Sequence, residues 1–461
     1  MSNVLIVSHD YIRKAMAGPA IRNFELAHQT HRAGHRVTLA VPESTDIDEQ
    51  PFEVIVWGDG SDTLRRAAHA QDVVLVQGWV LERNMWLFQT GARIVVDIYD
   101  PFHYEFIAAN EVEVGGVATD WPLVLFTLSE QLRTGDFFLC ASERQRDMWI
   151  GALSMLNRIN HETYVQDPTL RSLIGVVPFG LSAEPPRKVG SAYRGVVPGI
   201  GADDFVLLWG GGIYNWFDPL TLIRAVGMVA ESHPQVRLFF MATAHPSEGV
   251  PEMAMVGRAV DLARELGLEG NHVFFNEEWV PYDRRQDYLL EADVGVSTHY
   301  EHLETRYSFR TRILDYLWAG LPVLCTSGDS LADLVELHDL GVTVGPEDEA
   351  AAADAIRGLI DKRDERHAMA DRVRAFAVGM TWDKVAEPFL RYCDNPTSAA
   401  DLSPFERRTD GRPLLLRNDA ERLALSRGEN PDQRPLPQRV ARVLRREGPV
   451  GVARRMAKRL G

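Results

Sequence analysis

The chain has 461 residues, of which 45% are hydrophobic and 25% are charged, a composition typical of globular domains in water. Its formal net charge of −16 argues against a general affinity for nucleic acid. Three scattered cysteines are too few for a disulfide framework or a zinc site. No apolar run reaches the ~18–20 residues that span a bilayer. The first residues enter a strand without a signal-peptide pattern, so we expect a cytoplasmic protein.

The first half of the sequence predicts a parallel sheet covered by helices. An amphipathic helical pattern over residues 21–33 ends at Gly34, and strand-like runs flank it, which indicates a βαβ unit. Apolar runs that predict strands occur at 4–7, 35–42, 72–78, 92–100 and 136–142. Strands that are apolar on both sides and alternate with helices indicate a sheet that is buried on both faces.

The same order of elements restarts near residue 205, after a segment rich in proline and glycine. There FVLLW predicts a strand, GGG a loop and DPLTLIRAV a helix. We therefore predict an α/β protein with two doubly wound, Rossmann-like domains over residues 1–185 and 186–393. Residues 394–461 are predicted to form a linker and a basic, amphipathic helical appendage.

The stretch SFRTRILDYLWAGLP, which begins at Ser308, predicts a helix with unusual charges at its start. Ser308 suits an N-cap, but Arg310 and Arg312 oppose the helix dipole unless an anion joins them. Thr311 and Arg312 share a face with Asp315, one turn later. Free amides and arginines suit the phosphates of a nucleoside diphosphate, and the Asp315 carboxylate suits its ribose hydroxyls. The alternative is a surface salt bridge between Arg312 and Asp315, with Arg310 in solvent.

Five motifs follow one another along the chain: GPAIRNFELAHQTHRAGHRVTLAVP, GVVPFGL, FVLLWGGGIYNWFDPLTLIRAV, ADVGVST and DYLWAGLPVL. In this order they resemble family GT4 of the retaining GT-B glycosyltransferases, and the likeness covers roughly residues 1–393. It implies the GT-B fold and the transfer, with retention, of a sugar from a nucleotide-diphosphate sugar to a saccharide or polyprenyl-linked glycan acceptor. It also implies a front-side displacement in which the leaving diphosphate helps to deprotonate the acceptor, so that no protein nucleophile is needed. Because no metal cluster is visible in the sequence, we expect no metal and no cofactor beyond this donor.

The sequence departs from the family pattern in the residues that hold the diphosphate. In the family, an arginine and a lysine follow the glycine loop of the second domain, and these positions are Gly212 and Phe217 here. The resemblance therefore implies that Arg310 and Arg312 replace the two lost cations from the other side of the cleft.

The paired glutamates of the family are also altered. The first falls on Tyr307 and the second survives as Asp315, while Glu301 and Glu304 are nearby substitutes for the first. The predicted catalytic residues are Asp315, Arg310, Arg312 and His103. The predicted donor-binding residues are Gly210, Gly211, Gly212, Asn215, Trp279, Val280, Glu304, Ser308 and Thr311. For the glycine loop, the alternative is a tight turn that binds no ligand. For Trp279, the alternative is a side chain that packs on the sheet.

On the acceptor side, the prediction rests on two loop-to-helix junctions of the first half. Gly18 and Arg22 lie in AGPAIR, which faces the cleft in the resembled family. Asp100 and His103 follow a predicted strand, at the end of the sheet where α/β sites form. Tyr99 aligns best with the cleft histidine of the family, and His103 is proposed as its equivalent. The alternatives are a solvated Arg22 and a structural His103.

The last segment of the chain differs in charge from the rest. Residues 434–461 contain nine Lys or Arg and a single acid, Glu447, so they carry +8 and the remainder carries −24. Apolar residues recur among these arginines, the pattern of a helix lying on anionic lipid. We expect contact with the inner face of the cell membrane, near a lipid-linked acceptor. The alternatives are packing on the acidic body and contact with another macromolecule.

Other functions are also compatible with the sequence. A pseudoglycosyltransferase or a nucleotide-sugar epimerase would keep the fold but make another bond. A non-catalytic nucleotide-sugar-binding subunit of a glycosyltransferase complex would explain the lost cations, although relocated arginines argue against a dead site. An NAD-dependent oxidoreductase is not supported, because no G-x-G-x-x-G follows the first strand.

Overall fold

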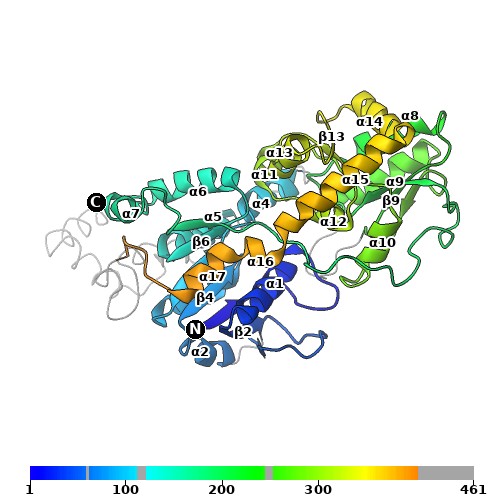
Figure 1. Cartoon of the computed structure of the whole chain (residues 1–461). Coiled ribbons are helices and arrows are strands. Elements are labelled where there is room, and N and C mark those ends of the chain that lie inside the picture. The colour runs from blue at the N-terminus through cyan, green and yellow to red at the C-terminus, as the bar shows by residue number, and fades with distance from the viewer. Residues whose placement is uncertain (59–61, 112–120, 244–252, 403–461) are drawn as a thin grey trace, which may run out of the picture.

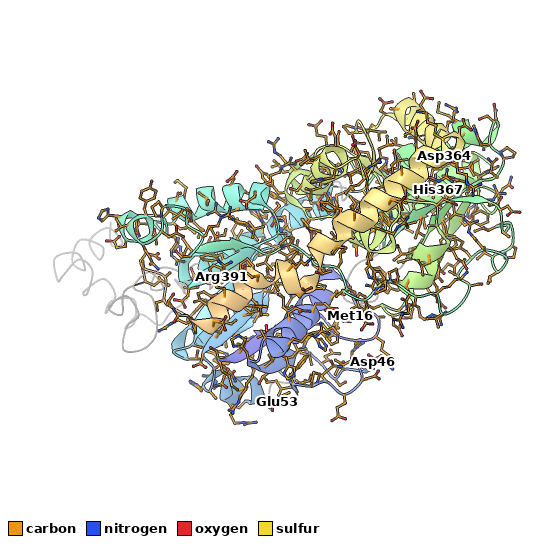
Figure 2. All side chains as sticks on the ribbon, in the orientation of Figure 1. Met16, Asp46, Glu53, Asp364, His367 and Arg391 are labelled. Atoms are coloured by element: carbon orange, nitrogen blue, oxygen red, sulfur yellow. The ribbon has the colours of Figure 1, made fainter. Side chains whose placement is uncertain are left out.

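The computed structural model describes residues 1–58, 62–111, 121–243 and 253–402, and Figure 1 shows two α/β lobes side by side. Each lobe contains one sheet whose strands all run parallel. This arrangement confirms the predicted α/β class with two Rossmann-like domains. Charged side chains such as Asp364 and Arg391 lie exposed on the surface helices (Figure 2).

Alternation along each strand explains why both faces of the sheets are covered. In β1 (Asn3–Val7), Val4 and Ile6 belong to one apolar cluster, whereas Leu5 and Val7 belong to another. Successive side chains of a strand point to opposite faces, so an uninterrupted apolar run requires helices on both. The same runs that predicted strands in the sequence therefore also predicted the layers.

The sheet of the first domain has the order β3-β2-β1-β4-β5-β6-β7. Its other strands are β2 (Arg36–Val41), β3 (Glu53–Val56), β4 (Val73–Gln77), β5 (Arg93–Asp97), β6 (Phe137–Cys140) and β7 (Ile174–Val176). Its helices are α1 (Gly18–Arg32), α2 (Thr63–Ala68), α3 (Val80–Arg83), η1 (Met85–Gln89), α4 (Phe102–Glu111), α5 (Trp121–Thr134), α6 (Glu143–Met155) and α7 (His161–Gln166). The short edge strands β3 and β7 escaped the sequence pattern.

The sheet of the second domain has the order β10-β9-β8-β11-β12-β13. Its strands are β8 (Phe205–Trp209), β9 (Val236–Phe240), β10 (Val273–Phe275), β11 (Val294–Ser297), β12 (Val323–Thr326) and β13 (Gly341–Val344). Its helices are α8 (Pro219–Ala230), α9 (Ala254–Glu265), α10 (Arg285–Glu291), α11 (Leu303–Tyr307), α12 (Thr311–Ala319), α13 (Ser330–Leu337) and α14 (Glu349–Asp361).

The last helices of the described chain return to the first domain. They are α15 (Arg363–Ala377), η2 (Val378–Met380), α16 (Trp382–Val385) and α17 (Glu387–Asp394), and Figure 1 shows α15 running from the second lobe toward the first. The hydroxyl of Ser2 donates to the carbonyl of Cys393 at 2.6 Å, and the ring of Tyr392 stacks on Phe137. The predicted boundary at residue 393 therefore does not mark the end of the second domain, because α17 packs on the first sheet.

The strand orders mark a candidate site in each domain. In the first sheet the order reverses at β1, which lies between β2 and β4, and in the second it reverses at β8, which lies between β9 and β11. In open α/β sheets, ligands bind where the carboxyl ends of the strands meet such a reversal. The loops that follow β1 and β8 are therefore the first place to look for a site.

Candidate functional site

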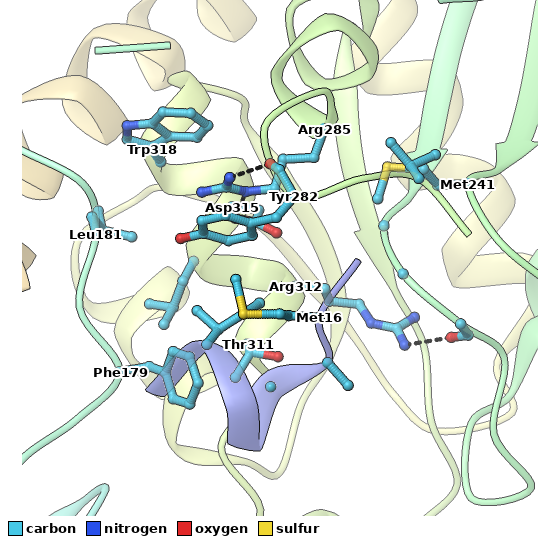
Figure 3. Close-up of a pocket in the computed structure, with 18 of the residues that line it drawn as sticks. Met16, Phe179, Leu181, Met241, Tyr282, Arg285, Thr311, Arg312, Asp315 and Trp318 are labelled. Atoms are coloured by element: carbon cyan, nitrogen blue, oxygen red, sulfur yellow. Dashed lines mark hydrogen bonds and ion pairs between the residues drawn. The ribbon is translucent and has the colours of Figure 1, made fainter. Parts of the chain in front are cut away.

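A cavity of about 150 Å³ lies between the two domains (Figure 3). The first domain contributes the junction before α1, with Met16 and Gly18, and the segment after β7, with Phe179 and Leu181. The second domain contributes its glycine loop, the loop after β10, and the starts of α10 and α12. Of the predicted residues, Gly18, Gly210, Gly211, Gly212, Trp279, Val280, Thr311, Arg312 and Asp315 line this cavity.

The glycine loop needs its glycines for two different reasons. Gly211 has a φ of +71°, in the left-handed region that side chains disfavour. At Gly212 an added Cβ would lie 3.3 Å from the ring of Trp279, so a side chain there would crowd the cavity wall. The loop thus exposes backbone to the cavity, as a phosphate or sugar site requires.

Arg312 is a buried cation that faces this loop. Its Nη2 donates to the carbonyl of Gly212 at 2.8 Å, and its guanidinium carbon lies 4.0 Å from the ring centre of Phe217. Its Nη1 is buried without a hydrogen-bond partner, and within the described residues it has no ion pair. Burial lowers the pKa of Arg312 to about 10, so the group remains charged at pH 7. The cavity wall therefore carries an uncompensated positive charge.

The contacts of Arg312 also bear on the two missing cations. Gly212 and Phe217 are the positions at which the sequence lacks an arginine and a lysine. The Arg312 guanidinium contacts both positions. The geometry of Arg312 therefore agrees with the expectation that an arginine of α12 replaces the positive charge missing from the glycine loop. Whether this charge binds a diphosphate stays a prediction.

Arg310 does not face the cavity, so that part of the prediction is wrong in geometry. Its Nη1 and Nη2 donate to the two carboxylate oxygens of Glu304 at 2.9 and 2.7 Å, and both residues are buried. The hydroxyl of Ser308 donates to the same carboxylate. Helix α12 has Arg310, not Ser308, at its N-cap position. The predicted Ser308 cap and the predicted free guanidinium are both replaced by one buried cluster around Glu304.

Asp315 lines the cavity with a partner that the sequence did not reveal. Its Oδ1 accepts from Nε of Arg285 at 3.0 Å, and 35% of its side chain is exposed. The alternative salt bridge to Arg312 is not formed. Arg285 begins α10 and lies in no recognisable motif, so only the fold brings it to Asp315.

Asn215 is a predicted donor-binding residue that serves the scaffold. Its side-chain oxygen accepts from the backbone amide of Met255 at 3.1 Å, near the start of α9. It is absent from the cavity wall. The prediction of Asn215 is therefore wrong in geometry, because the loop turns its side chain toward the neighbouring helix.

Arg22, predicted on the acceptor side, is fully buried beneath the cavity. Its Nε and Nη2 donate to the two oxygens of Asp97 at 2.6 and 3.0 Å, and its Nη1 donates to the carbonyl of Pro178 at 3.2 Å. The guanidinium also packs on Tyr99. Neither the predicted cleft-facing arginine nor the solvated alternative is observed, because α1 buries this face against the first sheet.

His103 likewise lies away from the cavity wall. Its ring packs against Tyr104 and Trp149, with centroids 4.0 and 5.6 Å apart. Burial lowers the pKa of His103 to about 4, so the imidazole is neutral at pH 7. This position corresponds to the structural alternative, and we do not place His103 in the cavity.

Asp100 lies at the same junction, near Glu105 of α4. Burial raises the pKa of Asp100 to about 6, and the charges of Glu304 and Asp97 act in the same direction. Burial and the charge of Asp100 raise the pKa of Glu105 as well. The structure therefore assembles three carboxyl groups and the Arg310 cation where α4 meets α11.

These carboxyl groups predict a pH dependence of stability. The folded-state pKa of about 6 for Asp100 exceeds the unfolded-state pKa of ~3.9. Asp100 therefore contributes fully to the stability of the fold below the unfolded-state pKa, and this contribution is lost as the pH rises through 6. Between pH 4.5 and 7.5 we expect this group to lower the free energy of unfolding by roughly 1–3 kcal/mol. Urea denaturation of the Asp100→Asn protein should show a smaller change over this interval; an unchanged profile would contradict the assignment.

No cluster of three or more His, Cys, Asp or Glu side chains suited to a metal ion occurs in the part of the chain that the structure describes. Likewise, none of the described helices is long and apolar enough to cross a bilayer. The basic segment 434–461 lies outside the described residues.

Parts of the sequence are similar to known proteins. Residues 204–362 match the family described as glycosyl transferases group 1. A D-inositol 3-phosphate glycosyltransferase of Nocardia farcinica is 26% identical over 220 residues, which cover 48% of this chain and 47% of that protein. The chain thus spans about half the length of this curated relative.

Solved structures are similar over most of the chain. The sucrose-phosphate synthase from Thermosynechococcus elongatus has a TM-score of 0.60 and 16% identity, covering 85% of this chain and 98% of that one. Anabaena Alr3699/HepE, solved in complex with UDP-glucose, has a TM-score of 0.58 and 16% identity, covering 84% and 99%. These likenesses confirm the GT-B fold.

Proposed function

We propose, from the match of residues 204–362 to the glycosyl transferases group 1 family and from the GT-B fold, that this chain transfers a sugar from a nucleoside-diphosphate sugar to a hydroxyl acceptor. The observation that carries the proposal is the Arg312 guanidinium, which is buried against the glycine loop without an ion-pair partner among the described residues. A buried charge is costly unless an opposite charge compensates it. A diphosphate in the cavity would supply that charge.

The residues on the cavity wall suit the three parts of a nucleoside diphosphate. Asp315 offers carboxylate oxygen to ribose hydroxyls, and Arg312 with the loop amides offers positive charge to the phosphates. Trp279 and Val280 line the wall after β10, where a base would lie. The cavity of about 150 Å³ is smaller than the ~300–1,000 Å³ typical of ligand sites, so we propose that the domains separate to admit the donor.

The chemistry in this proposal is stabilisation of the leaving diphosphate. Charge develops on its oxygens as the glycosidic bond breaks, and a fixed cation in a dry cleft lowers the energy of that state. Asp315 is the single carboxylate on the described cavity wall, and Arg285 engages it. We therefore propose, as in family GT4, retention without a protein nucleophile, with the departing diphosphate helping to deprotonate the acceptor.

The relatives suggest which substrates to test first. The Anabaena structure contains UDP-glucose, and the Nocardia relative is a D-inositol 3-phosphate glycosyltransferase. For this chain we propose a hexosyl donor and a saccharide or lipid-linked glycan acceptor. The donor test is a thermal-shift screen with UDP, GDP, ADP and dTDP, because a ligand that binds only the native state raises the melting temperature.

Turnover of the nucleotide sugar distinguishes a second candidate function from the proposed transferase. A non-catalytic nucleotide-sugar-binding subunit would also bind the diphosphate, and the absence of cations at Gly212 and Phe217 favours it. The enzyme should hydrolyse its nucleotide sugar slowly without an acceptor and faster with one. Tight binding without hydrolysis or transfer over hours would support the subunit instead. No shift with any of the four nucleotides would overturn both functions.

Membrane contact through residues 434–461 is a separate proposal that rests on their charge of +8. Deleting this segment is expected to abolish sedimentation with anionic liposomes while donor hydrolysis continues. Salt should weaken binding of the full chain, because lipid charges are screened at short range. Equal sedimentation with and without the segment would exclude this role.

A further inference from the structure

The Arg285 side chain makes an ion pair and one more hydrogen bond than that of Arg312. Its Nε donates to Asp315 at 3.0 Å and its Nη1 donates to the carbonyl of Tyr282 at 2.6 Å. The guanidinium carbon lies 3.6 Å from the ring centre of Tyr282 and 4.5 Å from that of Trp318. Figure 3 shows the guanidinium beside the Asp315 carboxylate, with these two rings around it. Such a planar cation, fixed by rings and hydrogen bonds, is suited to orienting a carboxylate.

Only one carboxylate oxygen is used in this contact. Oδ1 of Asp315 accepts from Arg285, and the side chain remains 35% exposed on the cavity wall. The side chain of Arg285 is 12% exposed. Asp315 is thus the more exposed member of the pair, and both residues line the cavity.

The same cluster touches the first domain. The backbone amide of Tyr282 donates to the carbonyl of Lys14 at 3.1 Å, and its hydroxyl donates to Glu25 of α1 at 3.5 Å. Trp318 donates through Nε1 to the carbonyl of Glu184, in the segment that joins the domains. The two rings that hold Arg285 are thus themselves held by contacts that exist when the cleft is closed.

We propose that Arg285 is a positioning residue that orients the Asp315 carboxylate for the donor ribose, and that closure of the cleft completes this arrangement through Tyr282 and Trp318. The inference rests on the proposed function, because it assumes that a nucleoside diphosphate occupies the cavity. Arg285 acts through Asp315, whereas Arg312 contacts the phosphates directly. The ribose and phosphate contacts can therefore be disabled separately.

The test compares two ligands that differ only in the ribose hydroxyls. The probe is the nucleoside diphosphate that gives the largest thermal shift, together with its 2′,3′-dideoxy counterpart, and affinities are measured by calorimetry. The wild type should prefer the hydroxylated ligand roughly tenfold or more, the value of a hydrogen bond to a charged group. In Arg285→Gln this preference should fall below about threefold, with Arg285→Lys intermediate.

Two comparisons separate positioning from direct contact or misfolding. Arg285→Gln should bind inorganic pyrophosphate within about threefold of the wild type, since Arg312 is untouched. The double variant with Asp315→Asn should discriminate no worse than Asp315→Asn alone, because the residues act as one unit. Arg284→Gln is the matched control: this neighbouring arginine is 48% exposed, pairs with the buried Asp287 and is absent from the cavity wall, so the variant should leave discrimination intact.

Each contrary result has its own meaning. If Arg285→Gln keeps the wild-type preference, or if the double variant loses affinity additively, the positioning role is wrong while the proposed function stands. If the wild type binds the ligand but ignores the hydroxyls, Asp315 does not hold the ribose and the inference also fails. If the wild type binds neither pyrophosphate nor any nucleoside diphosphate, the proposed function itself fails.

Discussion

An Arg312→Gln protein is expected to bind nucleoside diphosphates roughly ten- to a hundredfold more weakly than the wild type, the value of a lost charge-assisted contact. The corresponding nucleoside, which lacks phosphates, should bind almost as before. The physical reason is that Arg312 supplies a buried charge with no ion-pair partner in the described chain. Calorimetric titration with nucleoside, nucleoside diphosphate and inorganic pyrophosphate checks the result.

A control and a stability measurement make this prediction specific. Arg306 is an exposed arginine of the preceding helix α11, and Arg306→Gln should bind all three ligands normally. Removing an uncompensated buried cation should not destabilise the empty protein. If Arg312→Gln melts at a higher temperature and still binds the diphosphate normally, the guanidinium serves only to pack on Phe217. The main observation that supports the proposed function would then no longer support it.

Local sequence was sufficient for the parts of the cavity that lie at strand–loop–helix junctions. Gly210, Gly211 and Gly212 follow β8, and Trp279 follows β10, so their place at the cleft follows from the parallel order of the strands. Asp315 could be predicted from local spacing, because it lies one turn after Thr311 and Arg312 and so shares their face of the helix. These residues needed no knowledge of distant contacts.

The sequence could not show which arginines already have partners. Arg22 and Asp97 are 75 residues apart, and Arg285 and Asp315 are 30 apart. A long side chain reaches whatever the tertiary fold brings near, and no local periodicity records that choice. Even Glu304, six residues from Arg310, lies in a separate short helix. The error for Arg310 therefore arose from treating a helix start as exposed.

The buried Arg22–Asp97 pair leads to the largest expected effect on stability. Both side chains are fully buried and make two hydrogen bonds to each other. Arg22→Met would leave Asp97 without its counter-charge, which typically costs about 3–5 kcal/mol. Hydrogen exchange of the β1 and β5 amides should report this loss, because it measures local free energies of opening. The double variant Arg22→Met with Asp97→Leu should recover most of it, since well-packed apolar replacements are often neutral.

The loss of stability in Arg22→Met should also depend on pH, and the burial of Asp97 determines whether it grows or shrinks as the pH rises. Burial already raises the pKa of Asp97, and Arg22 opposes that shift; without Arg22, the folded-state pKa rises further. A carboxyl group whose folded pKa exceeds its unfolded value favours folding at low pH and loses that contribution as the pH rises. The Arg22→Met protein should therefore lie closer to the wild type at pH 5 than at pH 8. In the Arg22→Met, Asp97→Leu protein no carboxyl group remains at position 97 to titrate, so its difference from the wild type should vary much less with pH. A deficit in Arg22→Met that grows toward acid would mean that Asp97 is not the unpaired charge, and that Arg22 stabilises the first domain mainly by packing on Tyr99.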